Sequence, residues 1–129
     1  MTTVSRRASF FTDEHKAGKA TFRFDAARPF DVDVDFGPDS TGEHVVWTFA
    51  RDLLADGLTG PAGFGDVRCQ ASGIYYHISL TSSEGHVFLT FIAEQIRAFC
   101  VDAEDLVPYG SEALDFDAEL DALLKDGAR

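Results

Sequence analysis

The sequence predicts an α+β fold in which about seven mainly antiparallel strands are followed by two C-terminal helices. Three observations predict it. The first 90 or so residues alternate apolar and polar side chains with a period of two, which is typical of strands with one buried and one solvated face. Turn residues separate these runs. Apart from one short helical turn, apolar residues at helical spacing appear only near the C-terminal end of the chain. The sequence therefore lacks the regular alternation of strands and helices that is typical of a parallel sheet.

Seven runs carry the strand pattern and are expected to share one sheet. They cover residues 4–11, 20–25, 31–36, 45–49, 67–71, 74–81 and 87–91. The segment Ser82–Gly85 separates the last two runs and predicts a hairpin. His77 and His86 flank this hairpin, so they could face each other on neighbouring strands. Two ligands do not make a metal site, and we interpret the histidines as structural or exposed.

Three segments carry helical signals. Residues 50–57 predict a short helical turn that ends at Gly57. Residues 92–101 and 116–125 each place apolar residues on one stripe. The stripes consist of Ile92, Ile96, Phe99 and Cys100, and of Phe116, Leu120, Leu123 and Leu124.

Length and composition indicate one globular domain over residues 1–129. The chain is 45% hydrophobic and contains 12 Phe, so core material is plentiful. Cys69 and Cys100 match no paired spacing and are expected as free buried thiols. No apolar run approaches the ~20 residues of a membrane helix, and the first residues are polar where a signal peptide is apolar. We therefore expect a cytoplasmic protein that does not insert into the membrane.

The charge of the chain is strongly negative and unevenly distributed. It has 22 acidic residues against 11 Lys and Arg, which gives a net charge of -11. Residues 1–28 carry six Lys and Arg against three acids (+3), whereas residues 102–129 carry two against nine (-7). Binding of phosphate polymers depends on dense cationic side chains. The charge therefore argues against nucleic acids and anionic membranes as partners.

No segment matches a catalytic, cofactor or metal motif. Asp31, Asp33 and Asp35 resemble the opening of a calcium loop, but the sixth and twelfth positions hold Phe36 and Gly42 instead of Gly and Glu. We expect these aspartates on the solvated face of a strand.

Two further segments are expected to be structural. The glycine-rich stretch 60–66 lacks the lysine of a phosphate-binding loop and is interpreted as a connection. In 19–24, basic and aromatic residues interleave, but the aromatic face is interpreted as core. The sequence thus predicts no enzyme and no cofactor.

One region resembles a known family. The segments Val46–Leu58 and Pro61–Arg68 are similar to the signature region of the SsgA-like sporulation and cell division proteins of actinobacteria. Within them, Arg51–Leu54 and Gly65–Arg68 form the most specific pair, closer to SsgB-type than to SsgA-type members. The resemblance continues through most of the chain, in Phe24–Val32, Ile96–Phe99, Val107–Glu112 and Asp115–Leu120. Residues 101–104 depart from the family pattern.

The resemblance implies a fold and a role. It implies a whirly-like, barrel-like sheet with helices, assembled as a homotrimer. It implies a non-enzymatic scaffold of sporulation-specific septation, which in SsgB-type members recruits the acidic, tubulin-like protein FtsZ to the septum and acts with other division proteins. Whirly relatives bind single-stranded nucleic acid, so the alternative is a nucleic-acid-binding module on the same fold. Lys16–Ala20 faintly echoes a basic stretch of those relatives.

Two sets of residues in the signature region are candidates for function or assembly. Arg51, Asp52 and Asp56 either brace the short helix or form a partner-binding surface. The second set is expected in the core or at a subunit interface. It consists of Trp47, Phe49, Leu53 and Leu54.

Overall fold

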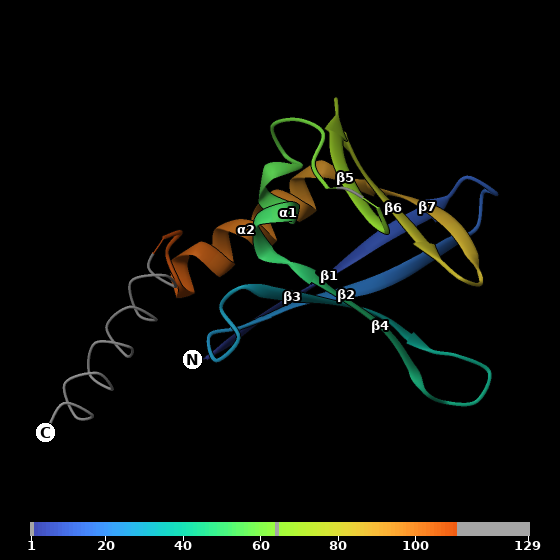
Figure 1. Cartoon of the computed structure of the whole chain (residues 1–129), viewed down its shortest axis with the longest axis horizontal. Helices are drawn as coiled ribbons and strands as arrows, with labels where there is room; N and C mark the ends of the chain where they lie inside the picture. The colour runs from blue at the N-terminus through green and yellow to red at the C-terminus, as the bar shows by residue number, and fades with distance from the viewer. Residues whose placement is uncertain (1, 64, 111–129) are drawn as a thin grey trace, which may run out of the picture.

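The computed structural model describes residues 2–63 and 65–110, which form a curved sheet and two helices (Figure 1). The elements in chain order are β1 (Thr3–Thr12), β2 (Ala17–Asp25), β3 (Asp31–Pro38), β4 (His44–Ala50), α1 (Arg51–Asp56), β5 (Val67–Ser72), β6 (Tyr75–Ser82), β7 (Gly85–Ile92) and α2 (Ala93–Leu106). The predicted α+β class and the seven antiparallel strands are confirmed. The helical turn predicted over 50–57 is confirmed as α1, which lies between β4 and β5, and the helix predicted over 92–101 corresponds to α2. The predicted helix over 116–125 lies outside the described residues.

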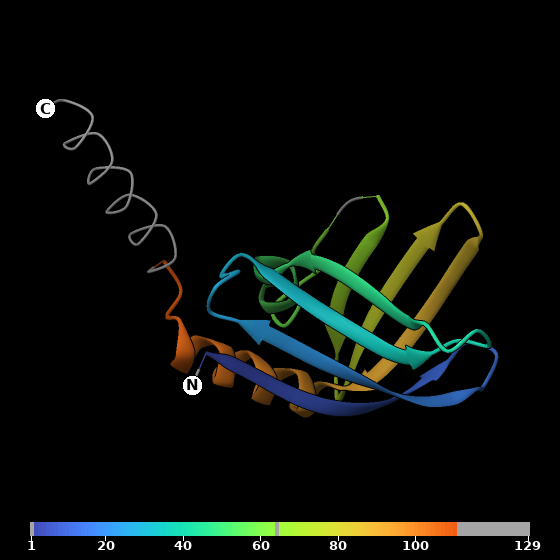
Figure 2. The same cartoon turned by 90° about the horizontal axis from the view of Figure 1, so that it is seen from below.

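The sheet consists of two antiparallel meanders joined at their first and last strands. Its strand order is β4-β3-β2-β1-β7-β6-β5. The meanders meet where Phe10–Thr12 of β1 pairs with Leu89–Phe91 of β7. The sheet bends into a half-barrel rather than a closed barrel, with β4 and β5 as its two end strands (Figure 2).

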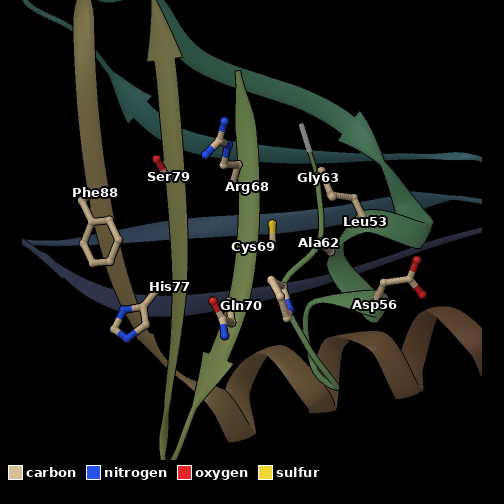
Figure 3. Close-up of a pocket in the computed structure, with 11 residues that line it drawn as sticks. Leu53, Asp56, Ala62, Gly63, Arg68, Cys69, Gln70, His77, Ser79 and Phe88 are labelled. Carbon is tan, nitrogen blue, oxygen red and sulfur yellow. The ribbon is translucent and has the colours of Figure 1, made fainter. Parts of the chain in front are cut away.

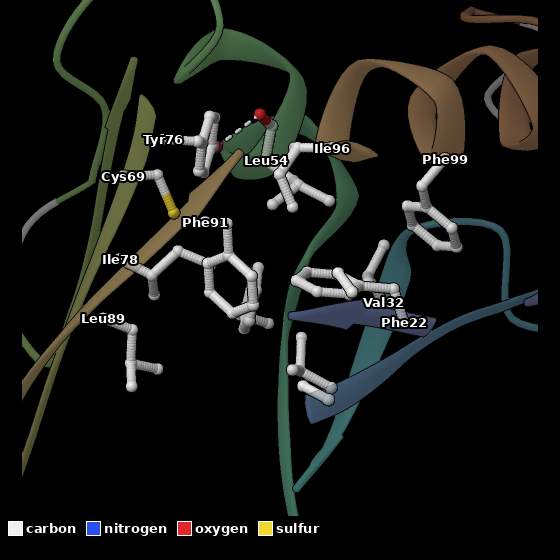
Figure 4. Packing of buried hydrophobic residues seen from close by; sticks show 14 of the residues in the cluster. Phe22, Val32, Leu54, Cys69, Tyr76, Ile78, Leu89, Phe91, Ile96 and Phe99 are labelled. Carbon is white, nitrogen blue, oxygen red and sulfur yellow. Dashed lines mark hydrogen bonds between the residues drawn. The ribbon is translucent and has the colours of Figure 1, made fainter. Parts of the chain in front are cut away.

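The core lies between the two halves of the sheet and under α2 (Figure 4). Phe22 of β2 is 1% exposed, and its ring lies 5.3 Å from that of Phe91 in β7 and 5.6 Å from that of Phe99 in α2. These three rings connect both meanders to the helix. The alternation that predicted the strands therefore reflects one continuous apolar interior.

Helix α2 begins directly at the end of β7 and buries a narrow apolar face. Its buried residues are Ala93, Ile96, Phe99 and Ala103. The helix ends just before Val107 and Pro108, because a residue that precedes proline disfavours helical geometry. Ile92 was predicted on the buried stripe, but it ends β7 and is 41% exposed.

The β6–β7 hairpin forms at Ser82–Gly85 as predicted. The strand register does not bring its two histidines together. His77 lies opposite Thr90, and His86 lies opposite Thr81. The expectation that they could face each other is therefore wrong, because they are offset by four residues along the ladder.

The aspartates of β3 lie on the outer face of the sheet as predicted, but they are not equally solvated. The Asp31 side chain is 47% exposed, whereas that of Asp35 is only 6% exposed. The Arg23 guanidinium donates a 2.8 Å hydrogen bond to Asp35, and the Gly37 amide donates another of 2.8 Å. Nδ1 of His44 lies 2.9 Å from the same carboxylate. These bonds, that of Arg23 foremost, lower the pKa of Asp35 to about 2.

Replacing Asp35 with asparagine should destabilise the protein in a pH-dependent way. The loss of charge-assisted hydrogen bonds should lower the free energy of unfolding by about 2 kcal/mol at pH 7. Because the folded pKa is lower than the unfolded value of about 3.9, the carboxylate contributes stability above that value and loses it as the pH falls toward 2. Urea denaturation at neutral and acid pH should show the difference shrinking over this window. The exposed Asp13→Asn variant is the control, and an equal loss there would contradict the assignment.

Candidate functional site

Arg51, the first residue of α1, is a buried anchor. It is 3% exposed, and its guanidinium lies 4.7 Å from the ring centre of Phe24 and 4.3 Å from that of Tyr109. Its Nη2 donates a hydrogen bond to the carbonyl of Val107, and its backbone amide donates to Phe30. A cation between two aromatic faces is strongly held when it is desolvated. Arg51 thus fixes the start of α1 to the end of α2.

The two acidic residues of α1 are exposed and lie one turn apart. Asp52 is in the first turn of the helix, where a negative charge suits the helix dipole. Asp56 is at the end and borders a groove. Neither forms an ion pair with any residue the structure describes. Of the sequence candidates in this region, these two are available to a partner, and Arg51 is not.

The apolar candidates divide between the interior and the groove. Leu54 is 1% exposed and Phe49 is 8% exposed, so both belong to the core. Trp47 and Leu53 are partly buried against that core. Leu53 also lines the groove beside Asp56.

A close contact between α1 and the sheet sets the position of this helix. The Tyr76 hydroxyl donates a 2.6 Å hydrogen bond to the carbonyl of Leu54, and the Ala71 amide donates to that of Gly57. A Cβ atom on Gly57 would collide with the Tyr76 hydroxyl and would lie 2.8 Å from Cβ of Cys69. Only glycine lets the end of α1 approach β5 and β6 so closely.

Between α1 and the outer face of β5–β7 lies an open groove of about 990 Å³ (Figure 3). The connection after α1 forms one wall and is held to β5 by two backbone hydrogen bonds of 2.9 Å between Ala62 and Cys69. In that wall Gly63 has φ +97°, and an added Cβ would collide with the carbonyl of Val67. The floor and rim consist mainly of Leu53, Asp56, Pro61, Arg68, Gln70, His77, Ser79 and Phe88.

The floor of the groove combines stacked rings with hydrogen-bonding groups. The rings of His77 and Phe88 stack with centres 5.0 Å apart, and Nδ1 of His77 lies 3.0 Å from the Thr90 hydroxyl. A concave site with apolar rings and a few polar groups is suited to hold side chains of another molecule. In the described part of the chain, no three or more His, Cys, Asp or Glu residues are grouped to hold a metal ion.

Neither cysteine offers a reactive thiol, although Cys69 contributes to the lining of the groove. Cys69 is buried, Cys100 is half-buried, and both are free. Burial raises the pKa of each thiol to about 11. At neutral pH both are therefore protonated and weakly nucleophilic.

The strands that form the floor of the groove belong to a larger face whose strands carry no acidic residues. Strands β1, β5, β6 and β7 contain no Asp or Glu, although the chain has 22. Arg7, Lys19 and Arg68 are exposed on the outer side of the sheet, and none of them pairs with a carboxylate in the described ranges. In contrast, Arg23 of β2 and Arg28 of the β2–β3 turn are paired with aspartates of β3. We call the outer side of β1, β5, β6 and β7, with the adjoining Lys19, the acid-free face.

Three large apolar side chains gather on the acid-free face, where β1, β6 and β7 meet, and a fourth, Ile74, precedes Tyr75 in the β5–β6 turn. Phe11 is 41%, Ile74 68%, Tyr75 38% and Ile92 41% exposed. Tyr75 pairs with Ile92 across β6 and β7, and its ring lies 6.1 Å from that of Phe11. We call these four residues the apolar patch. This patch is not predictable from the local sequence pattern, because segments far apart in the chain contribute to it.

Comparisons with known proteins agree on one family. The model of the family described as Streptomyces sporulation and cell division protein, SsgA, matches residues 19–112. SsgB of Frankia casuarinae is 38% identical over 114 residues, which cover 84% of this chain and 79% of the relative. SsgB of Streptomyces coelicolor is 38% identical over 113 residues, covering 83% and 82%. Both relatives are named sporulation-specific cell division proteins.

Two solved structures share the fold. One is SsgB of Streptomyces coelicolor, described with mutations that correlate to longitudinal cell division during sporulation. It aligns with a TM-score of 0.80 at 35% identity and covers 87% of this chain and 94% of its own. The other is an SsgA-like sporulation-specific cell division protein of Thermobifida fusca. It aligns with a TM-score of 0.73 at 26% identity and covers 94% and 95%.

Proposed function

Because this chain belongs to the SsgA family of sporulation and cell division proteins, we propose that it is a non-enzymatic scaffold that helps to recruit or position FtsZ at septum sites. It would act in the cytoplasm at the division septum, as a homotrimer. No helix among the described residues is long and apolar enough to cross a membrane. The observation that carries the proposal is the similarity to SsgB proteins over more than four-fifths of the chain.

The groove beside α1 is the proposed contact with FtsZ. It lies in the signature region and is bordered by Asp56, with Asp52 one turn away on the same helix. It is also lined by Arg68 of β5, a cation with no carboxylate partner in the described residues. FtsZ and this chain are both acidic, so long-range electrostatics oppose their encounter. Attraction must then come from short-range contacts such as the rings and the cation of this groove.

Binding to FtsZ should be weak per site, stronger on polymers and not weakened by moderate salt. Several copies in one oligomer can engage a polymer together, which raises the apparent affinity. Salt screens charges over about 8 Å at 0.15 M and weakens general repulsion more than close contacts. Surface plasmon resonance on monomeric and polymerised FtsZ should therefore give flat or slightly rising binding between about 50 and 200 mM salt. A strong interaction with the monomer that collapses with salt would contradict this reading.

Two sets of variants locate the contact. Arg68→Glu and Lys16→Glu both change the net charge from -11 to -13, so they alter long-range repulsion equally. Only Arg68→Glu should weaken FtsZ binding, by about tenfold.

Asp52→Ala and Asp56→Ala separate the two roles left open for these acids. If these acids contact the partner, the variants should bind FtsZ more weakly and keep their stability. If the acids brace α1, the variants should be less stable and keep their affinity for FtsZ.

The acid-free face is the one observation that favours the alternative function, because basic and aromatic side chains also bind single-stranded nucleic acid. The net charge of -11 opposes a polyanion. We therefore expect no appreciable binding of a fluorescent single-stranded DNA oligonucleotide at physiological salt. Sub-micromolar binding in fluorescence anisotropy, with a steep loss on adding salt, would instead support the nucleic-acid-binding module.

A further inference from the structure

We infer that the apolar patch, together with the neighbouring Arg7 and Lys19 of the acid-free face and apart from the groove, binds residues 111–129 of a second copy of this chain. This inference does not depend on binding to FtsZ. It names a contact for the proposed self-association, which the family resemblance leaves unspecified.

The patch has the setting of a protein-binding surface. Contiguous exposed apolar side chains with a polar rim mark interaction sites on globular proteins. Phe11, Tyr75 and Ile92 are held by strand pairing, so they lose little conformational freedom on binding. On the β1 side, Lys19 pairs with Ser9, and Arg7 extends from the same face of β1. An occupant must therefore offer apolar side chains and negative charge together.

Residues 111–129 have this chemistry. Six acids and two cations give the segment a net charge of -4. Its apolar residues follow the helical spacing i, i+4, i+7 and i+8 at Phe116, Leu120, Leu123 and Leu124. An amphipathic helix needs an apolar surface for its stripe. Residues 111–129 and the acid-free face are complementary in both charge and polarity.

The position of the segment favours a neighbouring copy. Ile92 lies at the beginning of α2, and the 14 residues of this helix lead the chain about 21 Å away from the patch. At its far end, Tyr109 is fixed by its contacts with Arg51. When such a contact is not reciprocal it is heterologous, and heterologous contacts form a ring where the rotation between neighbours closes. This geometry suits an oligomer with cyclic symmetry.

Disulfide crosslinking between two full-length variants tests the contact. A tagged Tyr75→Cys chain and an untagged Leu120→Cys chain are mixed and treated with a mild oxidant in the absence of FtsZ. We expect a linked tagged–untagged pair on a non-reducing gel. The control replaces Tyr75→Cys with Val101→Cys, because Val101 is 52% exposed on α2 and lies outside the patch. It should give only the background that Cys69 and Cys100 produce.

Two results would overturn the inference. One is a mixed pair no more abundant than with Val101→Cys. The other is a crosslink that forms only within single chains of a Tyr75→Cys/Leu120→Cys double variant, which would assign the segment to its own copy.

Light scattering gives a second readout. Ile92→Ser should reduce the oligomer mass, whereas Val101→Ser should not, and circular dichroism should show both folded. If Ile92→Ser keeps the wild-type oligomer mass and Tyr75→Cys gives only background crosslinking, this contact is refuted. Such results would still be compatible with self-association through another surface. A wild-type monomer at micromolar concentration would refute both.

Discussion

Replacing Phe22 with alanine should lower the free energy of unfolding by about 3–5 kcal/mol, because a buried aromatic ring is lost and a cavity remains. Phe22 is 1% exposed and contacts Phe91 and Phe99, so the cavity would open where both meanders meet α2. Domains of this size are stable by about 5–15 kcal/mol. The variant should therefore retain only a fraction of the wild-type stability.

Urea denaturation followed by Trp47 fluorescence measures this loss, since Trp47 is the only tryptophan. Phe30→Ala is the matched control, because Phe30 is 50% exposed. It should cost far less. Equal losses in the two variants would mean that the packing between the two halves of the sheet is not a main source of stability.

Replacing Arg51 with methionine should lower the free energy of unfolding by about 3 kcal/mol, because the buried guanidinium packs between two aromatic rings and donates a hydrogen bond. Methionine can fill the space between Phe24 and Tyr109, but it cannot donate to the carbonyl of Val107. That carbonyl would remain buried without this bond. The start of α1 would also lose its link to the end of α2, and the wall of the groove would become less well positioned.

Arg51→Met should also weaken the binding of FtsZ, beyond what its loss of folded protein explains. Under conditions where the variant is still folded, we expect weaker FtsZ binding because Asp56 and Leu53 on the groove wall are displaced. Arg97→Met removes an exposed arginine of α2 and serves as the control for both measurements. If Arg51→Met were as mild as Arg97→Met, the guanidinium would not be the anchor of α1.

The strands were predictable because their signal is local. In β2, Ala20, Phe22 and Phe24 alternate with polar residues, and this alternation follows directly from one buried and one solvated face. The hairpin at Ser82–Gly85 was predicted for the same reason. The signature region also includes α1, which contributes Leu53 and Asp56 to the lining of the groove.

Burial of charged groups was not predictable in the same way. Asp35 and Asp31 occupy equivalent positions of one alternating run, yet only Asp35 is covered by Arg23 and His44. Arg51 was a candidate for partner contact, but the end of α2 closes over it. In each case a segment elsewhere in the chain determines the solvation, and local periodicity contains no information about that segment.

The sequence by itself determined the α+β class, the strands and the family of this protein, because alternation and the signature region are properties of neighbouring residues. Only the tertiary structure decided which surfaces those residues form. The pairing of Phe10–Thr12 with Leu89–Phe91 joins two meanders that are distant in the chain. It places Phe11 beside Tyr75 and assembles the acid-free face from four strands. Such a surface depends on long-range register, which is fixed by packing of the shared core and not by the local pattern of any single strand.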